Sequence, residues 1–235
     1  MRLWDNSMKI KLSPSLERAD LLNLQHDVLA LKKAGVEYLH FDITDPQMLG
    51  TSLMSPAVIK PLNDLVDIPL DIHLILEKPL LIIDTILNES KGNIINIHPE
   101  TTLETTRLLK LAIEKGNETA VSLYPGTPLC VIDELLPYIK IVNLYIRDMG
   151  VDEPEVNQQM LNKIRNLRKK LDEAGYFEID IAVDGSVGYQ DIEQLLNAGA
   201  SILVLGRKTA FNPEYTIEEN IAYLREYIRS LGYEC

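Results

Sequence analysis

Residues 21–44, LLNLQHDVLALKKAGVEYLHFDIT, join a segment of helical period to a short apolar run. In the first part Leu21, Leu24 and Val28 recur at intervals of three and four residues, so their side chains share one face of a helix. The second part, 37–44, has the length and the apolar content of a buried strand. The stretch is therefore one helix-and-strand unit of the kind that builds parallel sheets.

The same alternation recurs about eight times along the chain, with a unit of about 29 residues. The expected strands are the runs 9–15, 37–44, 69–76, 93–100, 118–125, 139–146, 178–186 and 201–206. The expected helices are 21–34, 57–65, 80–90, 103–115, 129–138, 158–174, 190–198 and 217–231. Parallel neighbours need a crossover, so this pattern predicts an α/β fold, a closed (β/α)8 TIM barrel in a single domain over 1–235. An open doubly wound sheet would need a glycine fingerprint in the first strand-to-helix turn, and SPSLERAD, 13–20, contains none.

Composition excludes several classes of protein. The chain has 235 residues, of which 46% are hydrophobic, so it is not a disordered or fibrous protein. With 35 acidic against 23 basic residues the net charge is -12, which disfavours binding to nucleic acid or to an anionic membrane. The two cysteines, Cys130 and Cys235, lack metal spacing, and no signal peptide or membrane span is evident. A soluble cytoplasmic protein with reduced thiols is expected.

Polar residues stand at the carboxyl ends of the expected strands, where barrel active sites form. His40 and Asp42 are two positions apart, so they face the same side of the sheet; His73, His98 and Asp184 end other runs. A single strand-end histidine is better explained by a hydrogen-bonded core position. Two histidines and two carboxylates at one rim, however, favour one divalent ion such as Zn, Mn, Fe or Co. Asp71 sits lower in its strand and is expected to be a buried structural partner.

The two aspartates on the second and seventh strands also suit proton abstraction from carbon. Asp42 can remove a proton from one face of a substrate carbon while Asp184 delivers one to the opposite face. A metal between them would stabilise the enediolate oxygens. These residues predict epimerisation next to a carbonyl group.

At these residues the chain resembles the ribulose-phosphate 3-epimerase family, from about Lys9 to Phe211. The matching pieces are LSPS at 12–15, HFD at 40–42, PLDIHL at 69–74, PGTP at 125–128, KIR at 163–165 and VDG at 183–185. The resemblance implies an isomerase: a metal-dependent 3-epimerase of a ketose phosphate, of the ribulose 5-phosphate/xylulose 5-phosphate type. It also implies a small sugar phosphate as partner and a homo-oligomer.

The resemblance assigns roles to individual positions. It implies metal ligands at His40, Asp42, His73 and Asp184, and acid–base catalysis by the two aspartates. Substrate contacts are expected at Ser15, His73, Gly185, Ser186, Gly206 and Arg207. The sequences HPET at 98–101 and DGS at 184–186 lean toward the allulose-6-phosphate 3-epimerase branch, whose substrate is a ketohexose 6-phosphate.

The chain departs from the family where phosphate is bound and around the pocket. Methionines usual in the pocket are replaced at Thr44, Ile75 and Tyr145, and the glycine-rich loop after strand six becomes DMGVDEPE, 148–155. After strand eight the usual Gly-Ser becomes Gly206-Arg207, followed by Lys208. One interpretation is that Arg207 and Lys208 take over phosphate binding as charged donors. The other is a changed substrate, or a noncatalytic paralogue that binds a metal or sugar.

Of these two interpretations we favour retained phosphate binding, because 185–186 and 206–207 are expected to open the last two helices, whose amino ends attract anions. An orotidine-phosphate decarboxylase-like barrel lacks support, because HFDITD has no Asp-x-Lys motif.

Overall fold

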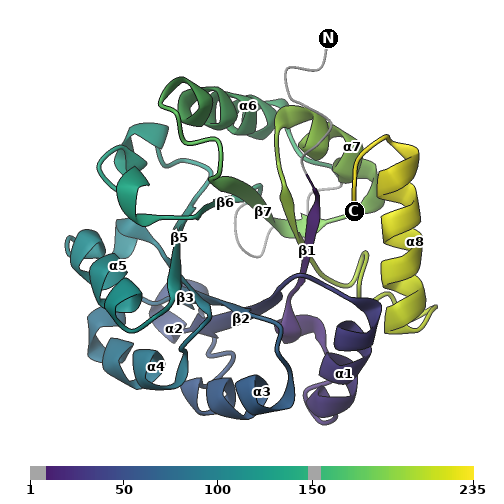
Figure 1. The fold of residues 1–235 in the computed structure, drawn as a ribbon, viewed down its shortest axis with the longest axis horizontal. Coiled ribbons are helices and arrows are strands. Elements are labelled where there is room, and N and C mark those ends of the chain that lie inside the picture. Colours follow the sequence, from purple (N-terminus) through teal and green to yellow (C-terminus); the bar gives the residue numbers. More distant parts are fainter. Residues whose placement is uncertain (1–8, 148–154) are drawn as a thin grey trace.

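Within the described residues, 9–147 and 155–235, the computed structural model has eight parallel strands at its centre (Figure 1). Their hydrogen-bonded order is β1-β8-β7-β6-β5-β4-β3-β2, and a parallel bridge between Ser15 and His40 brings β1 beside β2. The strands are β1 (Lys11–Pro14), β2 (Leu39–Thr44), β3 (Leu70–Ile75), β4 (Ile94–Ile97), β5 (Glu118–Leu123), β6 (Ile141–Tyr145), β7 (Asp180–Val187) and β8 (Ile202–Leu205). The predicted (β/α)8 barrel is confirmed.

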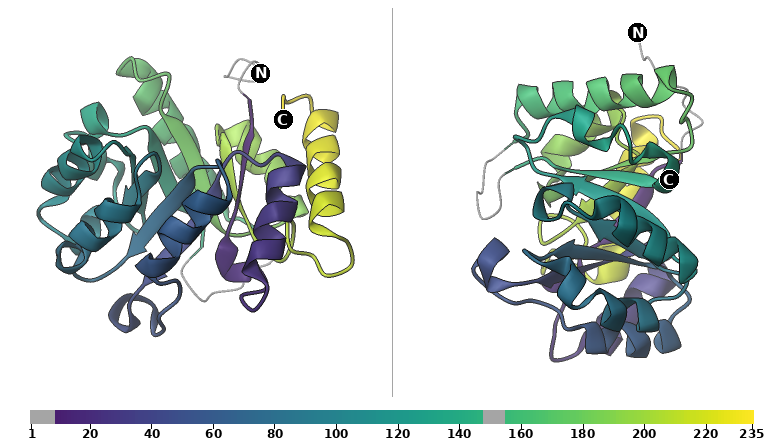
Figure 2. Two further views of the ribbon diagram at one scale, coloured as in Figure 1. Left: turned by 60° about the horizontal axis from the view of Figure 1, so that its bottom comes forward. Right: turned by 90° about the vertical axis from the view of Figure 1, so that its left-hand side faces the viewer.

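Helices surround the strands on the outside, as the two views of Figure 2 show. The α-helices are α1 (Leu24–Ala34), α2 (Pro46–Leu49), α3 (Ile59–Leu65), α4 (Ile83–Glu89), α5 (Thr105–Glu114), α6 (Gln158–Glu173), α7 (Tyr189–Ala198) and α8 (Ile217–Ser230). The 3-10 helices are η1 (Leu16–Arg18), η2 (Pro56–Val58), η3 (Pro79–Leu81), η4 (Pro99–Thr101), η5 (Leu129–Ile132) and η6 (Leu136–Tyr138). No helix in the described part of the chain is long and apolar enough to cross a membrane.

The predicted helix 129–138 is wrong as an α-helix, because this segment forms η5 and η6 instead. Pro137 explains the break. A proline inside a helix lacks the N–H donor, and its ring clashes with the carbonyl four residues earlier. A 3-10 turn that begins at Leu136 places this proline in its first turn, where no donor is needed.

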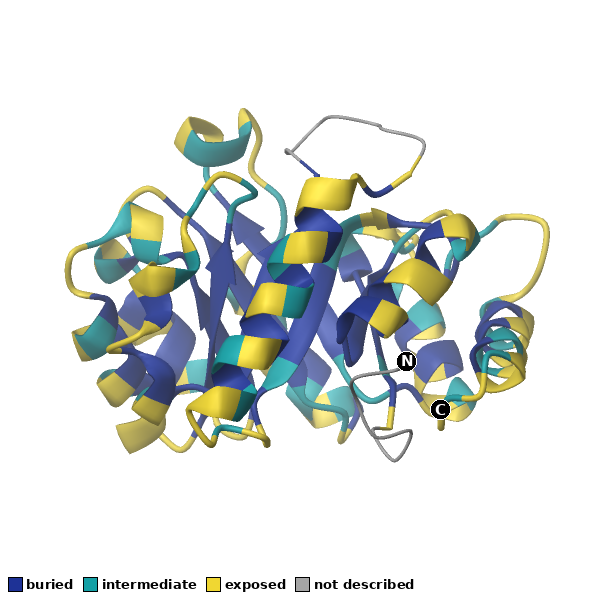
Figure 3. Ribbon diagram, turned by 90° about the horizontal axis from the view of Figure 1, so that it is seen from above, coloured by how far each residue is buried: buried dark blue, intermediate teal, exposed yellow. Residues whose placement is uncertain are grey.

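The strands are buried on both faces, and the longer helices bury the face toward the sheet (Figure 3). The larger hydrophobic cluster fills the space between strands and helices. A second cluster lies on inward-facing strand positions and consists of Ile94, Ala120, Ile141, Ala182 and Ile202. The barrel interior is therefore packed with side chains, and the site can form only at the mouth.

A chain of buried polar side chains crosses the barrel interior. The amide of Asn96 donates to Asp71 Oδ1 at 3.3 Å, and the hydroxyl of Ser122 donates to Asn96 Oδ1 at 2.8 Å. The Asn143 amide in turn donates to Ser122 Oγ at 3.0 Å. These bonds link β3, β4, β5 and β6, and they hold the carboxylate of Asp71 in place beneath the predicted site.

Candidate active site

The strand register brings the predicted ligands to one place. His40 and Asp42 are alternate residues of β2, and Asp42 pairs with His73 on the neighbouring β3. On the other side Asp184 of β7 pairs with Tyr145 of β6. All these residues lie near the carboxyl ends of their strands, so their inward-facing side chains converge at the barrel mouth.

Four nitrogen and oxygen atoms of these residues face one another closely. His40 Nε2 lies 3.0 Å from Asp42 Oδ1 and 3.4 Å from Asp184 Oδ2. His73 Nδ1 lies 3.2 Å from Asp42 Oδ1, 3.2 Å from His40 Nε2 and 3.8 Å from Asp184 Oδ2. No other set of histidine, cysteine and acidic residues with metal-ligand spacing occurs in the described chain.

This arrangement fits a divalent metal ion. Donor atoms held tetrahedrally at about 2.1 Å from an ion are about 3.4 Å from one another. Five of the six distances among the four donors lie between 3.0 and 3.8 Å, on either side of this value, and all four atoms lie within 4.8 Å of one another. Mixed imidazole and carboxylate ligands suit Zn, Mn, Fe or Co, and the donor set does not choose among them.

A carboxylate outside the ligand set orients the first histidine. His40 Nδ1 donates to Asp71 Oδ2 at 2.8 Å, which leaves Nε2 for the cluster. Burial lowers the pKa of His40, but the charges of Asp42 and Asp71 outweigh burial and raise this pKa well above the usual range. Burial raises the pKa of Asp42, but His40 and His73 outweigh it and hold that pKa well below the usual range. Without a metal, His40 is therefore protonated and Asp42 is ionised.

His98 packs against the second histidine. Its ring stacks on His73 at a centroid distance of 5.0 Å, and the two Nε2 atoms are 2.9 Å apart. Burial lowers the pKa of His98 to about 4, against the opposing influence of Glu100. His98 is therefore neutral near pH 7, and a hydrogen bond between the two Nε2 atoms leaves His73 Nδ1 turned toward the cluster.

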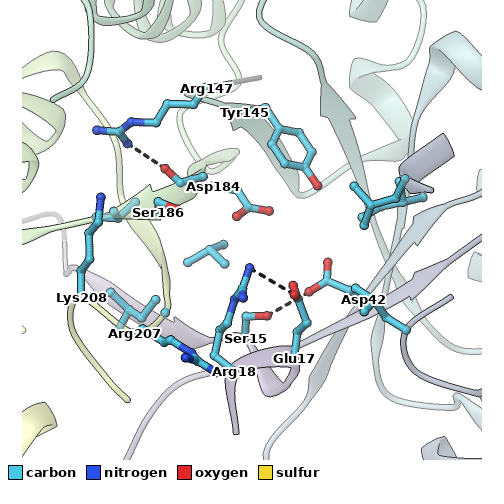
Figure 4. A pocket seen from close by; sticks show the side chains of 18 of the residues that line it. Ser15, Glu17, Arg18, Asp42, Tyr145, Arg147, Asp184, Ser186, Arg207 and Lys208 are labelled. Carbon is cyan, nitrogen blue, oxygen red and sulfur yellow. Dashed lines mark hydrogen bonds and ion pairs between the residues drawn. The ribbon is translucent and has the colours of Figure 1, made fainter. Parts of the chain in front are cut away.

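A cavity of about 450 Å³ opens above these groups (Figure 4). Ligand cavities in proteins have volumes of about 300–1,000 Å³. Of the predicted residues, its lining includes Ser15, Asp42, Asp184, Gly185, Ser186, Gly206 and Arg207. His73 is fully buried and is not part of the lining. The Ser15 hydroxyl donates to Asp42 Oδ2 at 2.9 Å and so fixes this carboxylate from the cavity side.

The expectation that 185–186 and 206–207 open the last two helices is wrong. Helix α7 begins at Tyr189, and Gly185 and Ser186 are near the end of β7. Helix α8 begins at Ile217, ten residues beyond Arg207. Both helix starts are also satisfied internally: Asp191 accepts from the Gly188 N–H, and Thr216 and Glu219 form a capping box. An anion in the cavity would therefore depend on side chains such as Arg207 and Lys208, which lie on the side away from Asp42 in Figure 4.

A buried ion pair shapes the wall between β6 and β7. Arg147 lies 3.0 Å from Asp191 Oδ1, and both side chains are almost fully buried. Arg147 also donates to the Gly185 carbonyl at 2.7 Å, and the Val156 N–H donates to Asp191 at 2.8 Å. The pair thus joins β6, β7 and α7, and it was not predicted because its members are 44 residues apart.

The backbone beside this pair has an uncommon conformation. Gly185 has φ +118°, and a Cβ there would meet the Arg147 backbone nitrogen at 3.4 Å. Ser186 follows at φ +54°, which is uncommon for a residue other than glycine. This turn presents Ser186 to the cavity.

Comparison with known proteins places the chain among sugar-phosphate isomerases. The model of the ribulose-phosphate 3-epimerase family matches residues 11–210. The chain belongs to this family. Ribulose-phosphate 3-epimerase of Escherichia coli (strain K12) is 30% identical over 87% of this chain and 90% of its own length. The Bacillus subtilis (strain 168) enzyme of the same name is 28% identical over 84% of this chain and 90% of its own length.

Solved structures support the fold. A mutant tryptophan synthase alpha-subunit from Pyrococcus furiosus superposes with a TM-score of 0.64 and 14% identity. The match covers 95% of this chain and 98% of the alpha-subunit. At this identity the likeness concerns the barrel alone. The predicted membership of the epimerase family, a class of isomerases, is confirmed by the family match and the curated relatives.

Several cavity residues of this epimerase-family chain were not predicted. Glu17 and Arg18 follow β1 on η1, and their side chains pair at 3.1 Å within the lining. Burial, and then the charge of Asp42, raise the pKa of Glu17. Their position just after a strand end is a signal that could have identified them. Tyr145, by contrast, was expected at the pocket as the replacement of a family methionine, and it ends β6 and lines the cavity. The predicted acidic loop 148–155 lies outside the described residues except for Glu155, which is exposed.

Proposed function

We propose that this chain is a 3-epimerase of a ketose phosphate, with Asp42 and Asp184 as the two acid–base groups. The observation that carries the proposal is their placement: both carboxylates line one cavity, yet they come from β2 and β7, which are three strands apart around the barrel. Such groups can reach a substrate carbon from two directions.

The reaction needs one proton removed and one returned. An ionised aspartate takes the proton from carbon 3 and leaves an enediolate, and the other aspartate, protonated, gives its proton to the opposite face. The reverse reaction exchanges the two roles. A divalent ion held by His40, Asp42, His73 and Asp184 would supply positive charge for the enediolate oxygens. Ser15 holds Asp42 through the bond to Oδ2, so its orientation toward substrate is set before binding.

The other side of the cavity suits the phosphate. Arg207, Lys208 and Ser186 lie on the wall away from Asp42. Gly185 and Gly206 also line the cavity. Guanidinium and ammonium groups bind a phosphate dianion by charge-assisted hydrogen bonds. We favour a pentulose phosphate of the ribulose 5-phosphate/xylulose 5-phosphate type; a ketohexose 6-phosphate such as allulose 6-phosphate is the alternative.

Exchange of the carbon-3 proton tests the function. In deuterated water the metal-loaded protein should incorporate deuterium at carbon 3 of ribulose 5-phosphate or allulose 6-phosphate. The sugar phosphate that exchanges faster is the preferred substrate. Asp42→Asn and Asp184→Asn should each slow exchange by roughly 10²–10⁴-fold. Asp180→Asn is the matched control, because Asp180 begins β7 at the opposite end of the barrel and pairs with Lys11. Absence of exchange with every ketose phosphate would contradict the proposal and favour a protein that only binds a sugar or metal.

A further inference from the structure

Tyr145 presents its hydroxyl to the cavity. Its side chain lines the cavity and only 6% of the residue is exposed. Figure 4 shows the hydroxyl pointing inward, on the side of Asp42 and Asp184. Within the described residues no side chain or backbone group bonds to this hydroxyl, and it is not one of the buried atoms that lack a partner, so it is open to the cavity.

The ring of Tyr145 is held in place by aromatic neighbours. It lies 5.6 Å from the His73 ring, 5.8 Å from His98 and 5.6 Å from Tyr124, at interplanar angles of 34°, 24° and 11°. Such offset stacks restrain a ring more than apolar burial alone does. The backbone is fixed too, because Tyr145 pairs with Asp184 in the sheet. The direction of the hydroxyl is thus determined before any substrate enters.

A fixed hydroxyl that opens into a cavity is a ready hydrogen-bond donor. The rest of the Tyr145 side chain is buried, so a bound molecule can reach this residue only through the cavity. Ligand cavities owe their specificity to a few such placed polar groups among apolar surroundings. Ser15, which also lines the cavity, already donates to Asp42. The Tyr145 hydroxyl is left as a neutral donor available to a bound molecule.

We propose that Tyr145 is a further catalytic residue, whose Oη donates a hydrogen bond to the enediolate oxygen on which negative charge develops. This inference rests on the proposed epimerase function. A fixed donor aimed at developing charge stabilises the transition state more than the ground state. The phenol keeps its proton throughout, so the proton balance remains that of Asp42 and Asp184.

The test is Tyr145→Phe, which removes the hydroxyl and keeps the stacked ring. The matched control is Tyr124→Phe, because Tyr124 stacks on the same ring but is not part of the cavity lining. Both variants and the parent are loaded with metal, and metal content and thermal unfolding are measured first. Deuterium incorporation at carbon 3, kcat and KM are then compared with ribulose 5-phosphate or allulose 6-phosphate, whichever the parent exchanges faster.

For Tyr145→Phe we expect kcat and the exchange rate to fall roughly 10²-fold, the effect of removing one donor to an oxyanion. KM, metal content and unfolding temperature should stay near the parent values, as they should for Tyr124→Phe throughout. An exchange rate within threefold of the parent would overturn the proposal. So would a higher KM at unchanged kcat, since that places the hydroxyl in ground-state binding. If the parent itself shows no exchange, the epimerase function fails and the inference falls with it.

Discussion

The two sides of the barrel mouth differ in how their side chains are held. The metal side, His40, Asp42, His73 and Asp184, consists of strand residues that contact one another and are largely buried. The cation side, Arg18, Arg207 and Lys208, consists of charged residues in the segments after β1 and β8. Arg207 and Lys208 are exposed, and Arg18 is half exposed.

This difference separates the chemistry from the choice of substrate. Buried ionisable groups must satisfy one another, so a change at one of them affects all the others. Replacing an exposed cation changes the stability of the fold little, because water and salt screen its charge. If the proposed function holds, the metal side determines whether a proton can be moved, and the cation side determines which anion is held. The variants below test this division.

The largest effect is expected from His73→Ala. Removing one of four ligands should reduce the metal content of the purified protein from about one ion per chain to a small fraction. Loss of several kcal/mol of charge stabilisation should slow carbon-3 exchange by about 10³-fold or more. Metal analysis and exchange measure the two results. His26→Ala, an exposed histidine of α1, is the control. Full metal content in His73→Ala would contradict the assigned ligand set.

Next in size is the double variant Arg207→Gln with Lys208→Gln. Each charge-assisted hydrogen bond contributes about 1.5–3 kcal/mol, so KM for the sugar phosphate should rise at least about tenfold. The value of kcat should change little, because these residues lie away from Asp42. Steady-state kinetics separates the two constants. Lys169→Gln with Lys170→Gln on α6 removes the same charge elsewhere. An unchanged KM would place the phosphate on other groups.

The metal side could be predicted from the sequence because its residues follow two local rules. Strand residues two positions apart face the same side, and the carboxyl ends of parallel strands meet at one rim. His40, Asp42, His73 and Asp184 therefore needed only correct strand positions. The parallel barrel itself followed from the alternation of strand and helix along the chain.

The cation side and the walls could not be predicted in the same way. The periodicity predicted the last two helices at 190–198 and 217–231, close to the observed α7 and α8, yet residues 185–186 and 206–207 were still expected to open these helices, which they do not. Arg147 and Asp191 form an ion pair although they are 44 residues apart in the chain. Hydrophobic periodicity cannot predict such a contact. The direction of the Tyr145 hydroxyl depends on three aromatic rings from other strands and loops. Such features arise from tertiary packing.

A smaller effect is expected from Asp71→Asn, which keeps the shape of the side chain but removes its charge. Partners that orient a metal-binding histidine typically contribute 10–100-fold to metal affinity. We expect metal affinity to fall by roughly this factor, while the ligand set and the fold remain. Competition with a chelator measures the affinity, and Asp180→Asn is the control. An affinity within twofold of the parent would mean that Asp71 only fills the barrel interior.

The last prediction concerns the pH dependence of metal binding. In the metal-free protein the pKa of His40 is raised well above the usual range, so a metal must displace a proton from His40 in order to bind. Metal affinity should therefore rise with pH, by up to about tenfold per pH unit, as long as His40 is protonated in the metal-free protein, and it should fall as the solution becomes more acidic. In Asp71→Asn one of the charges that raise this pKa is absent, so the rise with pH should end at a lower pH. Chelator competition at several pH values measures both curves. A pH-independent affinity in the parent would show that His40 is already neutral, and that the buried carboxylates of the metal side do not act on it as described.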